Sequence, residues 1–476
     1  LQMRPSPDHP GLGQGERGEH SYQVQGDKPG QPGVAAALAL RARGGEVAGC
    51  DAGAVTEDVR ARLVAAGVAV RAPSEGVDLL ARASTVVKSP GVPQEAPVVA
   101  TARRQGTRIV GELEIGWRLV PNEFVAVTGS NGKTTTVELI GHVHRTAGWP
   151  VVVAGNVGTA LTTLPGTLAG DETVVCEASS FQLEDTEAFA PEAAVLLNIA
   201  EDHLDRYGSM EAYRAAKLQV FARQPPGTIA VAPAELAAGL AAHGRARRVT
   251  FGRGGAPLDF DERGTGPVDL HERDAGPADV EERGGRLWWR GEPLMGASEI
   301  RLRGAHNREN AMAAAAVCLA RGLPPESVRA GLASFTGIPH RLEEVGTAGG
   351  VLYVNDSKAT NVASAVVGIE SFEGGVHAIL GGRGKRGDYS PLARPVAERC
   401  RGAYLIGETA AEIHEALAPT GVALHDCQDL ERAVAAARSE ARPGDTVLLS
   451  PACASYDQYA SFEERGEHFR ALVTAG

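Results

Sequence analysis

Short apolar runs alternate with stretches of helical periodicity along almost the whole chain. In the first part, the pattern predicts strands over residues 46–50 and 85–88 and helices over 34–43 and 57–66. Thr56 is placed to cap the second of these helices. Strands that alternate with helices are typical of parallel sheets covered by helices. The pattern therefore predicts an α/β fold whose functional groups lie beyond the carboxyl ends of the strands.

The alternation continues to the end of the chain and predicts three domains, because 476 residues are too many for one hydrophobic core. We expect a Rossmann-like N-terminal domain over 1–113 (with 1–20 a floppy leader), a central P-loop mononucleotide-binding domain over 114–337 and a Rossmann-like C-terminal domain over 338–476. The later strands are expected at 173–176, 194–197, 351–354, 377–380, 402–406 and 446–449, with helices at 310–321 and 429–438.

Composition narrows the class of protein. Hydrophobic residues make up 43% of the chain, but no apolar run approaches the ~20 residues of a membrane span. A net charge of −12 without a block of Lys and Arg argues against nucleic acid as the main partner. The six cysteines are scattered and form no Cys-x-x-Cys pair, which favours a reducing cytoplasm. The polar N-terminus lacks the apolar core of a signal peptide.

The most informative motif is Thr128-Gly-Ser-Asn-Gly-Lys-Thr-Thr135, which lies between an apolar run and a helix-like stretch. Strand, glycine-bearing turn, Lys-Thr and helix are the layout of a phosphate-binding loop. Backbone N–H groups would face the phosphates, Lys133 would neutralise the outer ones, and the Thr134 hydroxyl would bind Mg²⁺. Val127 stands where the usual first glycine would be, so the loop is a tighter variant.

A second glycine pattern, near the N-terminus, is imperfect. In the Gly-x-Gly-x-x-Gly frame Gly30 and Gly33 match, but Lys28 occupies the first glycine position and residues 21–25 are a poor strand. Asp51 follows Gly33 by 18 residues, near where such folds place an acid on a ribose hydroxyl. A turn without a ligand fits this pattern about as well.

Polar groups also follow strands of the expected central domain. Glu177 comes directly after residues 173–176, and a carboxylate beside a phosphate loop suits a second Mg²⁺ ligand, although it could also cap the next helix. His203 could bind metal or orient a phosphate, but a lone histidine is more often packed or solvated. By spacing alone, Lys217 is an exposed lysine on a helix over 210–222.

Three segments after strands of the C-terminal domain could seat anions. Asp356 and Lys358, which project to the same side, suit a ribose or metal-bound water and an anionic oxygen, or equally a structural ion pair. Gly381-Gly-Arg-Gly-Lys-Arg-Gly387 collects three cations and suits a carboxylate or phosphate. Ser450-Pro-Ala-Cys-Ala-Ser455 offers a hydroxyl, and its Cys453 has no obvious base and is not interpreted as a nucleophile.

Residues 260–285 contain three copies of a ten-residue repeat rich in Gly, Pro and Glu-Arg. Three copies cannot build a solenoid core, and this composition buries little apolar surface. We therefore expect a charged surface insertion. Deleting Asp261 to Glu282 should leave catalysis within about tenfold.

Taken together, the motifs resemble those of the Mur ligase family, the amide-forming ligases that build the peptidoglycan peptide. The resemblance covers residues 26 to 474, and the phosphate loop marks the superfamily as a whole. Ser179-Ser-Phe-Gln-Leu-Glu184, Asn355-Asp-Ser-Lys-Ala-Thr-Asn361 and Ser450-Pro-Ala-Cys-Ala-Ser455 are more specific. They resemble the branch that adds D-glutamate to UDP-N-acetylmuramoyl-L-alanine.

The resemblance implies a role for each candidate residue. Residues that match ATP contacts are Gly129, Ser130, Asn131, Gly132, Lys133, Thr134, Thr135, Asn307, Asn310, Arg341 and Asp356. Residues that match contacts with the UDP-sugar or D-glutamate are Ser89, Gly91, Asn156, Ser179, Lys358, Thr360, Lys385, Ser455 and Phe462. Residues that match ligands of two Mg²⁺ ions are Thr134, Glu177, His203 and a carbamylated Lys217. The implied catalytic residues are Lys133, His203, Lys217 and Lys385.

The implied activity is an ATP-dependent ligase reaction through an acyl phosphate, in a cytoplasmic monomer whose partners are small molecules. Because water must be kept from the acyl phosphate, we expect the C-terminal domain to close during the reaction. Because the first glycine loop is imperfect, the resemblance does not decide whether Asp51 contacts the UDP part of the substrate.

Four other functions share part of this pattern. A folylpolyglutamate synthase would lack the first hundred residues, and a diaminopimelate- or lysine-adding Mur ligase would carry an Asp-Asn-Pro-Arg motif that is absent here. A nucleotide-dependent switch that hydrolyses ATP slowly would need no second-substrate pocket. An NAD-dependent oxidoreductase rests on the imperfect glycine pattern alone.

Overall fold

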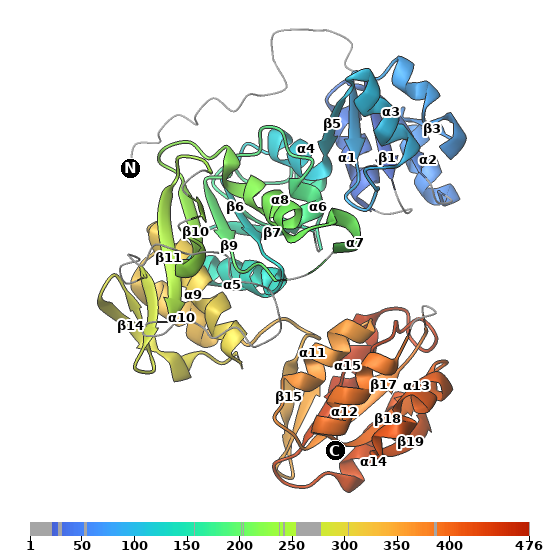
Figure 1. Cartoon of the computed structure of the whole chain (residues 1–476), viewed down its shortest axis with the longest axis vertical. Helices are drawn as coiled ribbons and strands as arrows, with labels where there is room; N and C mark the ends of the chain where they lie inside the picture. Colours follow the sequence, from blue (N-terminus) through green and yellow to red (C-terminus); the bar gives the residue numbers. More distant parts are fainter. Residues whose placement is uncertain are drawn as a thin grey trace. The chain divides into compact units, whose positions relative to one another are not determined.

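A computed structural model describes residues 21–26, 31–51, 55–156, 158–200, 202, 204–237, 239–240, 243–253, 278–302, 304–384 and 388–475. The chain divides into two compact units, Leu1–Phe335 and Thr336–Gly476 (Figure 1). Their sheets and helices make this an α/β protein of more than one domain. None of the helices in the described part of the chain is both long and apolar enough to cross a membrane.

The first unit begins with a parallel five-stranded sheet in the order β3-β2-β1-β4-β5. Its strands are β1 (Ser21–Gly26), β2 (Glu46–Asp51), β3 (Ala69–Arg71), β4 (Thr85–Lys88) and β5 (Arg108–Gly111). The helices between them are α1 (Gln31–Ala42), α2 (Glu57–Ala65) and α3 (Pro97–Gln105). The expected strands 46–50 and 85–88 are therefore confirmed.

A nine-stranded sheet follows in the same unit, in the order β14-β13-β12-β11-β10-β9-β6-β8-β7. Its strands are β6 (Phe124–Thr128), β7 (Val151–Gly155), β8 (Thr173–Glu177), β9 (Ala193–Leu196), β10 (Ile229–Pro233), β11 (Arg247–Arg253), β12 (Val280–Arg283), β13 (Arg286–Trp289) and β14 (Glu292–Gly296). Its helices are α4 (Glu112–Leu119), α5 (Lys133–Thr146), α6 (Ser180–Leu183), α7 (Leu204–Tyr207), α8 (Met210–Ala222), α9 (Ala305–Ala320) and α10 (Pro325–Ser334). The strands from β7 to β12 are parallel, and β13 and β14 close the far edge as antiparallel strands.

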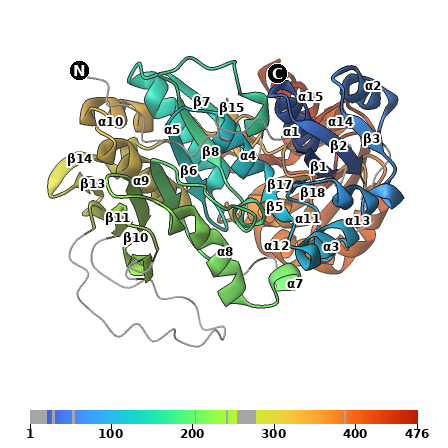
Figure 2. The ribbon, with the colours of Figure 1, turned by 90° about the horizontal axis from the view of Figure 1, so that it is seen from above.

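Both faces of the central strands are covered by helices. Helix α8 contacts β6 and β9, and Leu218 and Phe221 on this helix join a buried cluster with Phe124 and Ala126. Helix α5 contacts β7 and β8 and packs against α9, an arrangement that Figure 2 shows from above. This two-sided burial explains why β6 and β8 are continuously apolar and were recognisable from the sequence.

The second unit is a six-stranded sheet in the order β15-β16-β20-β17-β18-β19 (Figure 1). Its strands are β15 (Glu343–Ala348), β16 (Val351–Asn355), β17 (Val376–Gly381), β18 (Cys400–Ile406), β19 (Ala423–Gln428) and β20 (Thr446–Leu449). Its helices are α11 (Val362–Glu370), α12 (Ala393–Arg399), α13 (Ala410–Leu417), α14 (Leu430–Glu440) and α15 (Phe462–Thr474). Only β15 is antiparallel to its neighbour in this sheet.

Several local expectations need correction. The segment at 21–25 is a strand after all, and β1 lies in the middle of its sheet because β2 and β4 pair with it on either side. Thr56 occupies the N-cap position of α2, but its side chain makes no capping hydrogen bond. Helix α9 begins at Ala305, more than one turn before the expected start at residue 310.

The repeat region also differs from expectation at its C-terminal end. Residues 254–277 lie outside the described part of the chain, but Val280–Arg283 form β12. Val280 is fully buried and pairs with Phe251 of β11 and with Trp289 of β13. A deletion from Asp261 to Glu282 would therefore remove part of the sheet, and the expectation that it is harmless is wrong.

We expect Val280→Asp to lower the free energy of unfolding by at least ~3 kcal/mol, because an unpaired carboxylate would be buried between two strands. The unfolding transition of the first unit in urea measures this loss of stability. Glu281→Gln is the matched control, since adjacent strand residues face opposite sides of a sheet and Glu281 is only partly buried. Equal stability of the Val280→Asp and Glu281→Gln proteins would contradict the buried position of β12.

Candidate active site

The phosphate loop lies between the end of β6 and the start of α5, as the sequence predicted. Gly132 has φ of +83°, and a Cβ there would come within 2.2 Å of Asn310 Oδ1. Both the backbone conformation and the space therefore require glycine. The first N–H groups of α5 have no intrahelical acceptors, so the loop presents donors at the positive end of a helix dipole.

Two lysines converge on the carbonyl oxygen of Gly129. Lys133 Nζ donates to this oxygen at 2.8 Å and to Ser130 O at 2.8 Å. Lys217 Nζ, from α8, donates to Gly129 O at 2.8 Å. Two lysine side chains therefore lie against one side of the loop, and the charge of Lys133 suits a polyphosphate.

The loop is also fastened to the segment that follows β9. Ser130 Oγ accepts a hydrogen bond from Ala200 N at 2.9 Å and lies 3.1 Å from Tyr213 Oη. Asn131 N donates to Asn198 Oδ1 at 2.9 Å. These bonds hold the turn open in one conformation before any ligand arrives. His203 continues this segment but lies outside the described residues.

Glu177 lies at the carboxyl end of β8, next to the phosphate loop. Thr134 Oγ1 donates to Glu177 Oε2 at 2.8 Å, and Asn156 Nδ2 donates to Glu177 Oε1 at 3.0 Å. Glu177 is only 3% exposed, so its carboxylate is aimed by these two donors. The structure thus brings together Thr134, Glu177 and Asn156, which the sequence separates by up to 43 residues.

This donor set fits Mg²⁺. Magnesium prefers oxygen ligands and keeps several waters, so that one carboxylate, one hydroxyl and substrate phosphates suffice. No group of three or more His, Cys, Asp or Glu side chains suited to a metal occurs among the residues that the structure describes. Thr134 and Glu177 offer one oxygen ligand each, so an ion held by them would complete its coordination with water and phosphate oxygens.

Lys217 is the residue for which spacing alone gave the wrong interpretation. Its side chain is 1% exposed, and its Nζ lies 4.4 Å from the centre of the Tyr213 ring. Burial, together with the nearby positive charge of Lys133, lowers the pKa of Lys217 to about 7, although Asp202 opposes the shift. A substantial fraction of this amine is therefore unprotonated and nucleophilic at neutral pH.

Two further groups of candidates lie in the first unit. Asn310 Nδ2 donates to Asn307 Oδ1 at 3.2 Å, and Asn310 reaches the phosphate loop at Gly132. Ser179 is the N-cap of α6, where Gln182 completes a capping box. Ser89 and Gly91 follow β4, and Ser89 is buried whereas Gly91 is exposed.

In the second unit, β16, β20 and β17 are neighbours, so the loops after them meet at one edge of the sheet. Asp356 follows β16 and accepts hydrogen bonds from Ser450 Oγ at 2.7 Å and from Leu342 N at 3.2 Å. Burial raises the pKa of Asp356 to about 7, while these bonds and the charge of Arg341 oppose the shift. Asp356 therefore pairs with Ser450 in this unit, and Lys358 instead lies near Phe462, with its Nζ 5.9 Å from the ring centre.

Arg465 holds these loops together and was missed by sequence reasoning. It is 1% exposed, and its Nε and Nη2 donate to Ser357 Oγ and Ser357 O, both at 2.9 Å. Nη2 also donates to Cys453 O at 3.1 Å. Ser455 lies two residues farther along this loop and is buried. Nothing in the sequence distinguishes Arg465 from a solvated arginine on a surface helix.

The remaining candidates of this unit are placed as follows. Thr360 is partly buried just before α11, and Arg341 is exposed. Lys385 lies outside the described residues. Cys453 is buried, with its Sγ 3.3 Å from Thr409 Oγ1 and 3.5 Å from Tyr389 Oη. None of these contacts is with a general base, which agrees with the interpretation that Cys453 is not a nucleophile.

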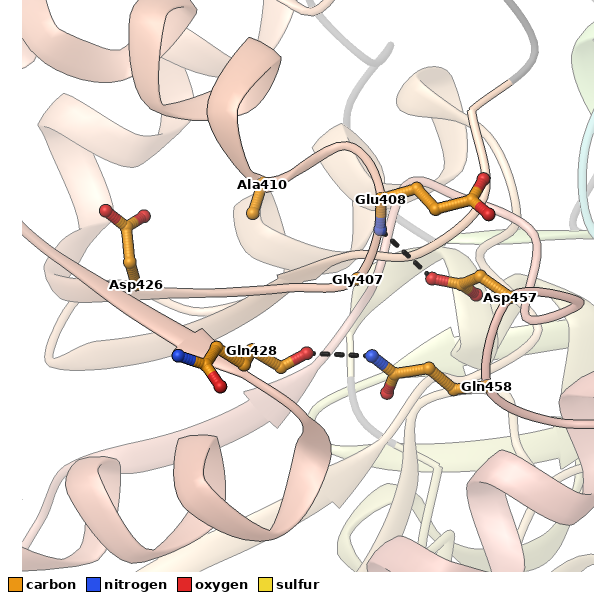
Figure 3. A pocket seen from close by; sticks show the side chains of 7 residues that line it. All are labelled: Gly407, Glu408, Ala410, Asp426, Gln428, Asp457 and Gln458. Atoms are coloured by element: carbon orange, nitrogen blue, oxygen red, sulfur yellow. Dashed lines mark hydrogen bonds between the residues drawn. The ribbon is translucent and has the colours of Figure 1, made fainter.

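A separate hollow of about 380 Å³ lies at the carboxyl ends of β18 and β19 (Figure 3). Glu408, Asp426 and Asp457 line it, and Gln458 Nε2 donates to Gln428 O at 2.7 Å across one side. Three carboxylates would repel a dicarboxylate amino acid or a phosphate. The hollow is therefore unsuited to the anionic substrates that the other loops favour.

Comparison with known proteins identifies the family. The Mur ligase middle domain matches residues 127–318, and the Mur ligase glutamate ligase domain matches residues 340–453. The UDP-N-acetylmuramoylalanine–D-glutamate ligase of Acidobacterium capsulatum is 41% identical over 459 residues, which cover 94% of this chain and 95% of the relative. The enzyme of the same name from Koribacter versatilis is 38% identical, with 93% and 95% covered.

A solved structure agrees on the fold. UDP-N-acetylmuramate–alanine ligase MurC from Thermotoga maritima is 18% identical, has a TM-score of 0.53 and covers 96% of this chain and 99% of its own. This chain belongs to the Mur ligase family. The relatives that match it over most of its length carry the name of the D-glutamate ligase, so the resemblance inferred from the motifs is confirmed.

The raised pKa of Asp356 predicts a pH dependence of stability. The folded state keeps this proton up to about pH 7, whereas the unfolded state loses it near the ordinary aspartate pKa of 3.8, so that Asp356 destabilises the fold increasingly as pH rises between these values. We expect Asp356→Asn to gain up to ~4 kcal/mol relative to the native chain across this window. Urea denaturation at several pH values measures the difference.

The exposed Glu408 provides the control, because Glu408→Gln also removes one carboxylate but from a solvated position. Its stability profile should remain parallel to that of the native chain. Parallel profiles for Asp356→Asn as well would show that Asp356 ionises as an ordinary carboxyl group.

Proposed function

We propose that this protein joins D-glutamate to UDP-N-acetylmuramoyl-L-alanine, with hydrolysis of ATP to ADP and phosphate, in the synthesis of peptidoglycan precursors. The observation that carries the proposal is the identity near 40% with ligases of that name over more than nine-tenths of the chain. The phosphate loop and the three specific motifs lie within the matched region and agree with this proposal. All six cysteines are free, which suits the reducing cytoplasm that we propose as its location.

The first step is attack of the substrate carboxylate on the γ-phosphate of ATP, which forms an acyl phosphate and releases ADP. Lys133 offsets the repulsion between the two anions, and the N–H groups at the start of α5 hold the phosphates. Asn307 and Asn310 are proposed to contact adenine, and Arg341 and Asp356 to contact the rest of the nucleotide. Preorganisation of the loop by Asn198 and Tyr213 supports the proposed role of the loop in holding the phosphates.

Two Mg²⁺ ions, when bound by Thr134 and Glu177 and by His203 and a modified Lys217, would supply positive charge that brings the carboxylate and the triphosphate together. The Thr134–Glu177 contact supports the first site. The proposed modification is addition of CO₂ to the neutral amine of Lys217, which forms an N–C bond, releases a proton and leaves a carbamate. The buried position of Lys217 beside the loop supports it.

In the second step the amine of D-glutamate attacks the acyl carbon, a tetrahedral intermediate forms, and phosphate leaves. Lys358, Thr360, Lys385, Ser455 and Phe462 are the residues proposed to seat D-glutamate. Support comes from the hydrogen bonds of Arg465, which tie the loop before Lys358 to the loop before Ser455, and from the bond of Ser357 to Phe462 at the start of α15. Ser89, Gly91, Asn156 and Ser179 are proposed to contact the UDP-sugar.

A slow ATPase switch is the remaining alternative from a different class. A switch requires no seat for a second substrate, whereas this chain places three polar loops at one edge of its last sheet. The ligase and the ATPase switch differ in whether continued release of ADP requires an amino acid.

We expect steady-state ADP production to require both UDP-N-acetylmuramoyl-L-alanine and D-glutamate, because without the amine the acyl phosphate is not consumed and each protein molecule forms ADP only once. L-glutamate should support a rate lower by at least ~100-fold, a difference of about 2.7 kcal/mol in barrier, because the seat for the amino acid is chiral. A coupled assay for ADP measures this, with Lys133→Ala as the inactive control. Equal rates without an amino acid, or with L-glutamate, would overturn the proposal.

Substitutions of Lys217 test the carbamate separately. Lys217→Ala should nearly abolish turnover, and Lys217→Arg should do no better, because a guanidinium keeps its positive charge and does not add CO₂. A short carboxylic acid added to Lys217→Ala should restore part of the rate by replacing the missing anionic oxygens. If Lys217 instead acted as a cation on phosphate, Lys217→Arg would stay active and the acid would rescue nothing.

A further inference from the structure

Lys88, the last residue of β4, is a buried charge that the reaction described above does not use. Its side chain is 0% exposed. Nζ donates to Val92 O at 2.9 Å and lies 3.5 Å from Ser89 O. The ammonium group therefore contacts both ends of the turn that follows β4. The turn is closed by Val92 N, which donates to Ser89 O at 3.1 Å.

The charge of Lys88 is balanced by residues from a different part of the first unit. Its Nζ lies 2.8 Å from Asp185 Oδ2 and 4.0 Å from Glu184 Oε1. Both carboxylates follow α6, and Asp185 is almost completely buried. A buried ion pair keeps both partners in fixed positions, since separating them would leave an uncompensated charge.

Further side chains connect the same two segments. Gln94 Nε2 donates to Glu184 Oε1 at 2.7 Å and to Asp185 Oδ1 at 3.1 Å. Arg206 pairs with Glu184 and lies 3.5 Å from Pro90 O. The backbone of Gly111, at the end of the neighbouring strand β5, also donates to Asp185 O at 2.8 Å. The residues after β4 are thus joined to the end of α6 through Lys88, Gln94 and Arg206.

The segment that receives these contacts also reaches the phosphate loop. It begins at Glu177, whose carboxylate accepts the hydrogen bond from Thr134, and it ends at Asp185. Ser179 and the capped turn of α6 lie between these two residues. A single short and rigid stretch therefore contacts the phosphate loop at one end and the turn after β4 at the other.

We propose that Lys88 is a positioning residue: its ion pair with Asp185 holds the Ser89–Val92 turn in the conformation that binds the sugar nucleotide and in register with the phosphate loop. The inference rests on the proposed function, in which Ser89 and Gly91 contact the UDP-sugar. Lys88 itself faces the turn's carbonyl oxygens, so it acts through the turn and not on the substrate.

The test uses three variants of the full chain. Lys88→Met keeps the length of the side chain and removes the charge, which leaves Asp185 unpaired. Lys88→Met/Asp185→Asn also removes the unpaired carboxylate and retains an oxygen acceptor for Gln94. Arg108→Met is the matched control, because Arg108 of β5 also joins the first sheet to residues after α6, through Glu187.

Calorimetry measures the dissociation constants of UDP-N-acetylmuramoyl-L-alanine and of ADP, and thermal unfolding measures stability. We expect both Lys88 variants to bind the sugar nucleotide about tenfold more weakly, equivalent to ~1.4 kcal/mol, with ADP binding unchanged. The Tm should fall in Lys88→Met and recover in the double variant, because only the single variant buries an unpaired charge. Arg108→Met should bind both ligands as the native chain does.

The result separates positioning from a purely structural role. If the double variant recovers affinity together with Tm, or if Lys88→Met binds the sugar nucleotide normally, Lys88 serves stability alone and the inference is wrong. Equal weakening of both ligands would also overturn it. Failure of the native chain to bind UDP-N-acetylmuramoyl-L-alanine would instead count against the proposed function.

Discussion

A charged side chain buried beside an apolar sheet is stable only when other groups compensate its charge, and this requirement shapes every functional loop of the protein. Among such side chains, Lys88 and Glu177 end their strands, and Lys217 and Arg465 lie on helices that face functional loops. Each is compensated by groups from a segment distant in sequence, whether a carboxylate, a hydroxyl, an amide or a row of carbonyl oxygens. A loop that moved would leave one of these charges unpaired. The contacts that compensate the buried charges therefore also hold the loops of the site in place.

The parts of the fold that were predictable are those fixed by local pattern. Strand β6, the glycine-bearing turn and α5 follow one another within a short stretch, and each has its own signal in apolar run, glycine and Lys-Thr. Glu177 was recognisable for a topological reason, since the carboxyl ends of neighbouring parallel strands must lie at one edge. In the same way, the order of the strands in the second unit brings together the loops that carry Asp356 and Ser455.

The residues that escaped prediction depend on distant contacts. Lys217 donates to a carbonyl oxygen 88 residues away in the sequence, and Arg465 to a serine 108 residues away. The local pattern of apolar and polar residues therefore does not show that these two side chains are buried. In the sequence, a helical lysine whose side chain packs against a loop has the same neighbours as a helical lysine that faces water. The strand character of 21–26 was missed for a related reason, because pairing with β2 and β4 on both sides, not composition, makes it a strand. Val280 begins one of the charged repeats in the sequence, but its pairing with Phe251 makes it part of the sheet.

The parallel pairing of β11 with β12 has a consequence for how this chain tolerates change in length. Phe251 and Val280 are partners in the ladder, so this pairing, and not the number of residues between the two strands, sets the register. The entropy of closing such a connection grows with the logarithm of its length, and doubling it costs only ~0.6 kcal/mol. Gain or loss of a whole ten-residue repeat before Val280 would therefore leave the register of the sheet intact, and the spacing between these strands can vary among otherwise equally stable forms of the protein.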